Sequence, residues 1–378
     1  MPLILALVLI LLAQVSYSEE SWNSKGVLKY HGKYFNLPED ALLAEIGGET
    51  QTPQNLNLRL MIDTEASDWL LVTHYQLDFL FSPDENLTTG SDIDKGRLFD
   101  LTHSIIDQED KRVLQRLDRL YAHYRSDDFS VKLGRQAVTW GNAFFFHAMD
   151  LFNPFSPIAL DTEYKPGDDM LYADWLFSDG SDLQALLVPK RNAQGKLAED
   201  SSSAAIKYRT LLNDVEIDIL ASRHEGSMLG GIGVARSVGE SMGRLDLVVK
   251  HQSSGDLSYS LVTNVDYSWV AFERNMYGYV EYYHNGDDSG LAGIPLTTSD
   301  YYGAGLQIEL HPLIGFTPSV LGSIDDKSGL IYLSSYYNMK QDFIVNASLI
   351  VPFGPNDSEY NGPSTLGRSV SILLNYYF

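Results

Sequence analysis

The last thirteen residues, Leu366–Phe378, constrain the fold of this chain more than any other segment. They read LGRSVSILLNYYF and end on phenylalanine. Apolar side chains occupy every second position from Val370 to Phe378, and Ser369, Ser371 and Asn375 lie on the other face, with Leu373 and Tyr377 as apolar exceptions. A two-residue period over about ten residues predicts a β-strand that crosses a membrane. In a soluble domain, the same segment would be an aromatic edge strand exposed to aggregation.

This segment resembles the closing strand of bacterial outer-membrane β-barrels. In those proteins a terminal aromatic residue, preceded by alternating apolar residues, is read by the machinery that inserts the barrel. The resemblance implies that Tyr376 and Phe378 form an assembly signal and that the barrel-assembly machinery is a partner. It places the chain in the outer membrane of a Gram-negative bacterium and says nothing about a transported solute.

The N-terminal residues 1–18 predict a secretory signal peptide, so the chain is expected to cross the inner membrane. Leu3–Val15 is almost uniformly apolar, and the small residues Ser16 and Ser18 suit a cleavage site. The run is shorter than the roughly 20 residues that a bilayer-spanning helix needs. No lysine or arginine precedes it, so the α-amino group alone supplies positive charge. We therefore expect a signal peptide followed by one barrel domain at 19–378.

The composition excludes several classes of function. The chain has no cysteine, which excludes disulfides and thiolate metal sites. Its formal charge of −23 disfavours nucleic acid as a partner, because nucleic acids bind basic surfaces. The 23 tyrosines suit a boundary between water and lipid. The acidic excess predicts surface loops that bridge divalent cations or repel anions. No loop motif supports a resident metal, and we expect no cofactor.

Short alternating segments separated by turn residues follow one another from Asn55 to the C-terminus. Leu257–Trp269 and Phe343–Phe353 are clear examples, and their polar faces suit a wet interior. Connectors alternate between short and long, which is typical of barrels with short periplasmic turns and long outer loops. With Gly26–Phe35 as the first strand, the pattern predicts an all-β transmembrane antiparallel barrel of about 18 strands. A barrel of about 16 strands and a β-sandwich are the alternatives.

The long connector Thr139–Met170 predicts an element inside the barrel. It carries many aromatic side chains, which would form a large exposed apolar patch if the connector lay flat in water. We expect it to fold toward the lumen, either as a structural plug or as a constriction that senses the solute. Asn142–Met149 predicts a short helix that Asn153-Pro154 would stop. The candidate constriction residues are Trp140, Phe144, Phe145, Phe146 and Asp150.

Positive charge concentrates in two adjacent predicted strands. A charge on the lipid face costs about 2–4 kcal/mol at mid-bilayer, so these side chains are expected to face the lumen. Alternation places the side chain of Arg135 on the outer face, and the preceding Gly134 predicts a bulge that turns this side chain back toward the lumen. Opposite the acidic loop, the cations would create a transverse field across the pore. Alternatively, they pair individually and hold the loop against the wall. The pore-lining candidates are Arg119, His123, Arg125, Lys132 and Arg135.

Two sets of short motifs carry a further resemblance. Gly134–Gln136, Trp140–Gly141 and Asn153–Pro154 together resemble a G-R-Q…W-G…N-P segment of poorly characterised outer-membrane barrels that are porin-like or polysaccharide-export-like. Glu281–Gly286 resembles a late-strand E-Y-x-x-N-G pattern in the same proteins. The resemblance covers a small part of the chain. It implies an outer-membrane channel and carries no functional residues with it.

The sequence shows no H-E-x-x-H, G-x-S-x-G or metal-ligand spacing, so we expect no enzyme. His123, His284 and His311 lie on predicted inward faces, which leaves a triad assembled across strands as the alternative.

We therefore expect a channel for small polar or charged solutes, with outer-membrane lipids and lipopolysaccharide around it. One alternative is a component of an export or lipid/polysaccharide transport assembly, which would have periplasmic transport partners. The other is a barrel with a closed pore and an adhesive or enzymatic role.

Overall fold

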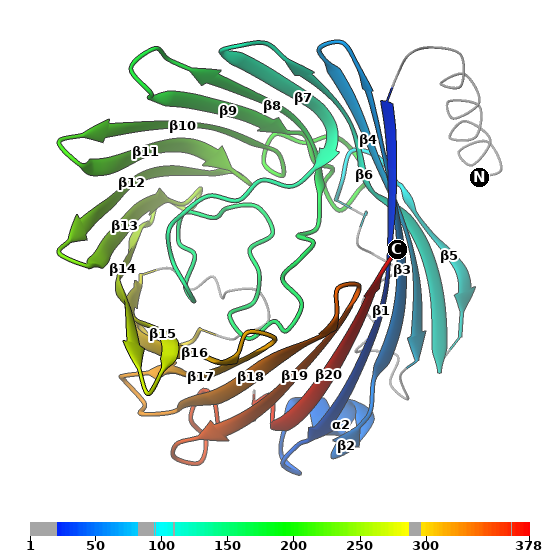
Figure 1. The fold of residues 1–378 in the computed structure, drawn as a ribbon, viewed down its shortest axis with the longest axis vertical. Coiled ribbons are helices and arrows are strands. Elements are labelled where there is room, and N and C mark those ends of the chain that lie inside the picture. Colours follow the sequence, from blue (N-terminus) through cyan, green and yellow to red (C-terminus); the bar gives the residue numbers. More distant parts are fainter. Residues whose placement is uncertain (1–20, 82–93, 95, 109, 287–295, 364) are drawn as a thin grey trace.

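A computed structural model describes most of the chain. The predicted signal peptide lies outside the described residues. Within them, the chain forms one antiparallel β-sheet that closes on itself (Figure 1). The described residues are 21–81, 94, 96–108, 110–286, 296–363 and 365–378.

No helix in the described part of the chain is long and apolar enough to cross a membrane.

Eighteen of the strands in the described residues form the ring in chain order. This confirms the predicted barrel and strand number, whereas the alternatives of sixteen strands and of a sandwich are wrong. Two extra strands lie beside the ring: β2 (Thr50–Gln51) pairs with β1, and β5 (Thr102–Asp107) pairs with β6. A short helix, α2 (Leu42–Gly47), precedes β2. The ring consists of β1 (Ser21–Asn36), β3 (Gln54–Ala66), β4 (Trp69–Phe81), β6 (Lys111–Arg125), β7 (Phe129–Gln136), β8 (Asp168–Leu176), β9 (Asp182–Val188), β10 (Ser203–Leu212), β11 (Val215–His224), β12 (Ser227–Val238), β13 (Ser241–His251), β14 (Leu257–Ala271), β15 (Arg274–Asn285), β16 (Asp300–His311), β17 (Ile314–Ser323), β18 (Gly329–Lys340), β19 (Phe343–Phe353) and β20 (Arg368–Tyr377).

The ring closes where β1 meets β20. Their register runs from Val27 opposite Tyr377 to the other end of both strands. Beyond it, Gly26 and Phe378 exchange two backbone hydrogen bonds of 2.7 and 2.9 Å. A Cβ atom on Gly26 would lie only 2.3 Å from the Phe378 ring. The terminal aromatic ring therefore occupies space at the seam that glycine leaves open.

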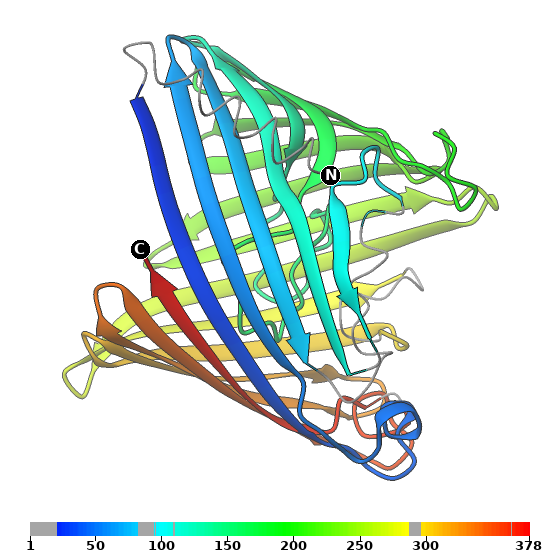
Figure 2. The same cartoon turned by 90° about the vertical axis from the view of Figure 1, so that its right-hand side faces the viewer.

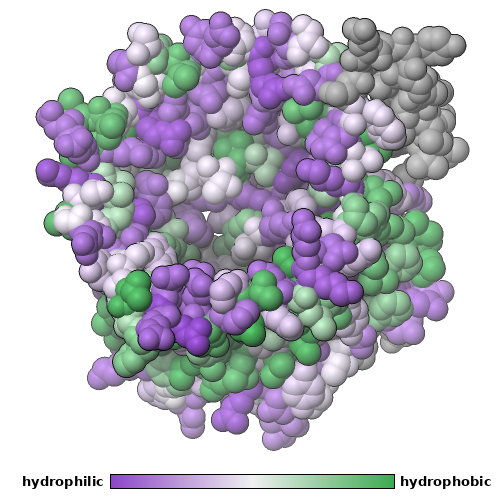
Figure 3. All heavy atoms as spheres, viewed as in Figure 1, coloured by the Kyte–Doolittle hydropathy of each residue, from purple (hydrophilic) through white to green (hydrophobic). Residues whose placement is uncertain are grey.

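The two faces of the strands differ as the alternation predicts. On β20, Val370, Ile372 and Tyr376 are exposed on the outer face, whereas Ser371 and Asn375 are buried on the inner face. The space-filling view shows hydrophobic residues along the outer side of the ring at the lower right, and a hollow near its middle (Figure 3). Apolar side chains outside and polar side chains inside are what a membrane barrel with an aqueous interior requires.

The wall is lowest at β7, β8 and β9, which have 8, 9 and 7 residues. The neighbouring β6 has 15 residues, and β7 pairs only with its second half, Leu120–Arg125. β5 lies along the first half of β6 (Figure 2). All three short strands adjoin long connectors at the end opposite the C-terminus. Those connectors complete the wall at this side of the barrel.

Candidate functional site

The connector between β7 and β8, residues 137–167, runs inside the barrel (Figures 1 and 2). We call it the inner loop. Its bounds differ from the predicted Thr139–Met170 because β8 already begins at Asp168. The loop crosses the hollow and contacts the inner wall on several sides, which places its aromatic and charged side chains within the lumen.

A single buried carboxylate on β15 holds the middle of the inner loop. The backbone N–H groups of Phe144, Phe145 and Phe146 all donate to Glu281, at 2.7, 2.9 and 2.7 Å. Asn264 on β14 also donates to Glu281, and it donates to the carbonyl oxygen of Asn142 at 3.2 Å. Hydrogen bonds to an ionised acceptor are among the stronger ones in proteins.

These contacts explain why the predicted helix at Asn142–Met149 is wrong. A helix would join the N–H of Phe146 to the carbonyl oxygen of Asn142. Here the side chains of the barrel wall take both groups, one through Glu281 and the other through Asn264. The segment has no helical assignment, and the wall satisfies its backbone instead.

Further anchors tie the inner loop to other parts of the ring. On β13, Asp246 accepts the N–H of Asn142 at 3.1 Å, and on β9, Gln184 accepts the indole N–H of Trp140 at 2.7 Å. Across the lumen, Lys29 on β1 contacts Asp161 and Glu163 of the loop, both at 2.8 Å. The loop is thus held from opposite sides of the barrel.

Most of the predicted constriction aromatics are buried between the loop and the wall. Trp140, Phe145 and Phe146 are at most 3% exposed. Phe146 stacks on Tyr283 of β15, with ring centroids 5.0 Å apart. Phe144 differs, because it remains partly exposed while it stacks on Tyr279 at 4.5 Å. Among the four predicted aromatics, Phe144 is therefore the one whose ring reaches toward the lumen.

The two arms of the inner loop are joined by an ion pair. Lys165 lies 2.7 Å from Asp150, and both side chains are buried. Burial raises the pKa of the Asp150 carboxyl and lowers the pKa of the Lys165 amine, and their mutual attraction opposes both shifts. Burial also lowers the pKa of the nearby His147 to about 4, with a further contribution from Lys165. His147 is therefore neutral at neutral pH.

Three guanidinium groups gather on the wall facing the inner loop. Arg59 and Arg119 contact Asp118 at 2.6 and 2.9 Å, and Arg59 and Arg116 share the side-chain oxygen of Gln76. Arg119 also donates to a backbone carbonyl oxygen of the inner loop. The sequence reasoning missed Arg59, which lies on β3 and joins the predicted cluster only across strands.

A bulge in β6 brings this cluster together. Arg116 pairs with Gln76 of β4 and Arg119 pairs with His74. Asp118 is the extra residue of the bulge and has no partner in the register with β4. In a regular strand, residues three apart point to opposite faces. The bulge turns Arg116 and Arg119 to the same inner face. Two arginines three residues apart, Arg116 and Arg119, were the signal in the sequence that could have predicted the bulge, because both charges need to face the lumen.

Two more of the predicted residues face inward on adjacent strands. His123 on β6 pairs with Lys132 on β7, and both are half-buried. The Lys132 amine lies 5.4 Å from the centre of the Tyr172 ring. Arg125 is exposed at the end of β6, beside the short turns, where it forms an ion pair with Glu65.

Arg135 occupies a different place. The registers of β7 with β6 and with β8 continue without a shift, so the predicted bulge at Gly134 is wrong. Arg135 shares the outer face with Leu133, and it is 1% exposed because the described part of the β4–β5 connector covers it. It contacts Asp94 at 3.0 Å and Asp169 at 2.9 Å. This placement puts Arg135 in the wall rather than beside the hollow.

Within the described residues, no group of three or more histidine, cysteine or acidic side chains suits a metal ion. Several acidic side chains of the loops bind backbone instead. Glu359, for example, accepts the N–H groups of Thr297 and Thr298 at 2.9 and 3.2 Å.

No family model and no curated protein matches the chain. Solved structures do resemble it. OccK5 (OpdH) of Pseudomonas aeruginosa has a TM-score of 0.59 at 9% identity, covering 94% of this chain and 98% of its own. OpdK of the same species, solved with vanillate, has a TM-score of 0.53 at 11% identity, covering 94% and 98%. Wzi of Escherichia coli, described as a carbohydrate-binding β-barrel involved in group 1 capsule assembly, has a TM-score of 0.57 at 8% identity, covering 93% and 84%. At these identities the likeness shows the fold.

Proposed function

We propose that this chain is a porin-like channel of the bacterial outer membrane that lets small polar or charged solutes cross. One observation carries the proposal: the inner loop packs against the wall through two apolar clusters, and a hollow remains beside it (Figure 3). The loop is held by charged side chains at opposite sides of the ring, through Glu281 and Lys29. A hollow remains near the middle of the ring (Figure 3). Solved barrels of similar fold support the same reading.

The charges of the wall would set the preference of such a channel for one class of solute. Arg59 and Arg119 contact Asp118, and Arg116 binds Gln76, which in turn binds Asp78, so three guanidinium groups lie beside two carboxylates and this part of the wall is locally positive. Lys132 adds a half-buried cation on the adjacent strand. A charged wall in a narrow lumen raises the local concentration of counter-ions. We therefore propose that the channel favours anionic solutes.

Conductance of the purified protein in planar bilayers tests the channel function. Discrete single-channel steps in salt are expected, and their absence would overturn the open pore. Deletion of Asn142–Ser156 removes the middle of the inner loop and should raise the step size. An unchanged step size would show that the loop does not limit the path.

Reversal potentials in a salt gradient test the ion preference. Replacing Lys132, Arg119 and Arg125 together by glutamine should shift the preference toward cations, because these side chains supply positive charge to the wall. Arg274→Gln, at the exposed start of β15, is the matched control and should leave the potential unchanged. If the triple variant keeps the wild-type potential, these residues do not line the path.

A second candidate function rests on the partly exposed rings of Phe144, Tyr277 and Tyr279. Phe144 stacks on Tyr279, and Tyr277 lies next to Tyr279 at 5.8 Å, so three rings line one side of the lumen. Aromatic faces suit the apolar faces of sugar rings, which favours a carbohydrate-binding barrel in an export assembly. Blocking of single-channel current by added oligosaccharides, and loss of the block in Phe144→Ala, would support this function over simple diffusion.

A further inference from the structure

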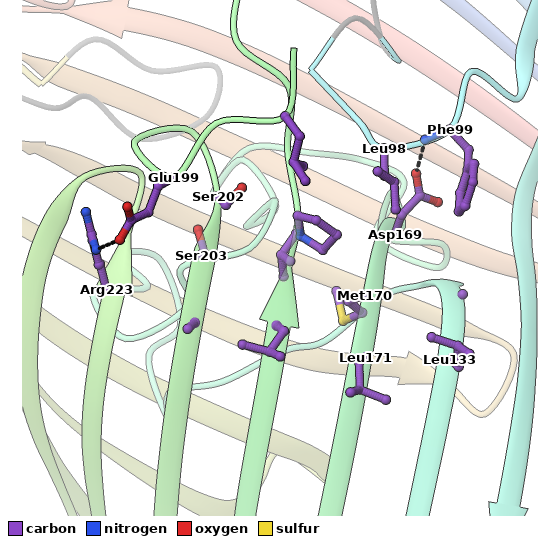
Figure 4. Close-up of a pocket in the computed structure, with 16 residues that line it drawn as sticks. Leu98, Phe99, Leu133, Asp169, Met170, Leu171, Glu199, Ser202, Ser203 and Arg223 are labelled. Atoms are coloured by element: carbon purple, nitrogen blue, oxygen red, sulfur yellow. Dashed lines mark hydrogen bonds and ion pairs between the residues drawn. The ribbon is translucent and has the colours of Figure 1, made fainter. Parts of the chain in front are cut away.

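An apolar trough runs down the outer face of the barrel at the low part of its wall. Its upper part is a cavity of about 500 Å³ that is lined by Leu133 and Leu171 (Figure 4) and by Leu187. A second cavity of about 490 Å³ continues it and shares Leu171, Leu187, Ala204 and Arg223 with the first. Small side chains form the lower part, so the trough is a groove between larger apolar neighbours. It faces the region where lipid surrounds the barrel.

Two connectors roof the upper end of this trough. Leu98 and Phe99 line this end from one connector (Figure 4). Leu197 lines it from the connector between β9 and β10. The two connectors are joined by a hydrogen bond from Arg191 N–H to the carbonyl oxygen of Gly96, at 2.8 Å. The roof therefore belongs to the folded wall.

A buried ion cluster fixes the roof to the strands. Arg135 donates to the carbonyl oxygen of Phe99 at 2.6 Å, and Asp169 accepts the N–H of Phe99 at 2.9 Å. Arg97 of the same connector contacts Asp168 at 3.2 Å. The G-R-Q motif thus supplies the residue that holds the roof in place.

Several cations lie in the roof connector next to the trough, and we call this part of the connector, together with Arg223, the rim. The chain has 27 basic and 50 acidic residues, yet the roof connector carries three cations, Lys190, Arg191 and Lys196, against two carboxylates, Glu199 and Asp200, and β11 adds Arg223. Arg223 pairs with Glu199, and Lys190 pairs with Glu225 at 2.8 Å. Arg191 and Lys196 add two exposed cations. Exposed cations beside an apolar groove complement a phosphorylated lipid.

We propose that this trough is a binding site for the lipid A part of lipopolysaccharide, with an acyl chain in the trough and phosphate groups at the basic rim. The trough lies at the end of the barrel with the long connectors, which is the outer side in barrels of this kind. Its occupant is thus a lipid of the outer leaflet. The inference goes beyond the proposed channel function, and it is independent of whether the pore conducts.

Native mass spectrometry of the purified protein, titrated with lipid A in detergent, tests the site. Ala204 lines both cavities, so Ala204→Phe fills the trough and should weaken lipid A binding at least about tenfold. Ala347→Phe places the same ring on the outer face of β19, away from the trough, and should bind like the wild type. Both variants must retain heat-modifiable gel mobility, which shows that the barrel is folded.

A second pair of measurements tests the rim. Arg191→Gln combined with Lys196→Gln should weaken binding of bisphosphorylated lipid A more than that of the monophosphorylated form. Equal binding of wild type and Ala204→Phe would overturn the site. Equally strong binding of phosphatidylethanolamine by the wild type would overturn the assignment to lipid A.

Discussion

Replacing Glu281 by glutamine is the sharpest perturbation of the inner loop. The carboxylate accepts three backbone N–H groups, from Phe144, Phe145 and Phe146. Hydrogen bonds to charged groups contribute about 1.5–3 kcal/mol each, and neutral ones about 0.5–1.5 kcal/mol. Glutamine keeps one acceptor oxygen, which can serve Phe145 and Phe146 as neutral bonds, while its NH₂ group opposes the N–H of Phe144. The substitution should therefore weaken the seating of the loop by about 3–6 kcal/mol.

Even the lower value of about 3 kcal/mol raises the population of the detached loop on the order of 100-fold. Hydrogen exchange followed by mass spectrometry measures this directly in the peptide that contains residues 144–146, and single-channel recordings should show added flicker. Glu309→Gln is the control, because Glu309 accepts a hydrogen bond from Asn275 at 2.8 Å and lies at the other end of the wall. If the exchange of that peptide is the same in Glu281→Gln and Glu309→Gln, the carboxylate does not hold the loop.

Three further predictions address the seam, the loop anchor and pH. Gly26→Val should reduce the yield of heat-modifiable barrel, because its side chain would enter the ring of the C-terminal phenylalanine, whereas Gly230→Val, which faces open space, should not. Lys29→Met removes the cation that binds Asp161, so the reversal potential should move toward cation preference; an unmoved potential would separate this anchor from the path. The depressed pKa of His147, about 4, means that the folded loop binds fewer protons than the unfolded chain between that pH and 6.5. Stability from this group is therefore present above pH 6.5 and lost as pH falls toward 4, so the protection of the loop, measured against the intrinsic exchange rate at each pH, should fall on acidification in wild type and less so in His147→Gln.

The strand pattern could be predicted because the membrane imposes it locally. Each residue of β20 meets either lipid or the lumen according to its parity, so Val370 and Ser371 reveal their sides without knowledge of any partner. Closure of the ring follows from the same logic, since an open edge has no place in a bilayer. The alternation and the closure depend only on nearby residues of the sequence and on the surrounding membrane, so one sequence is enough to predict them.

The contacts of the inner loop could not be predicted in this way. Phe146 and Glu281 are 135 residues apart, and many inward carboxylates alternate with apolar residues just as Glu281 does. For Arg135, two rules that use the sequence alone gave conflicting predictions. Alternation alone placed it outside, and the cost of a charge facing lipid argued against that position. The connector that carries Asp94 and Phe99 removes the cost by covering the guanidinium group, and nothing in the strand pattern announces that cover.

The acidic excess of the chain acquires a physical role from these contacts. Long connectors without helix or strand leave backbone N–H groups that need an acceptor, and an unsatisfied buried N–H costs as much as a lost hydrogen bond. In the described connectors, carboxylates fill this need repeatedly: Glu281 serves the inner loop, Asp169 serves Phe99, and Glu359 serves Thr297. A carboxylate accepts several bonds at once and requires no regular backbone. Acidic side chains, several of them on strands of the wall, can thus hold irregular segments inside and above a barrel, where a loop has no adjacent strand backbone to pair with.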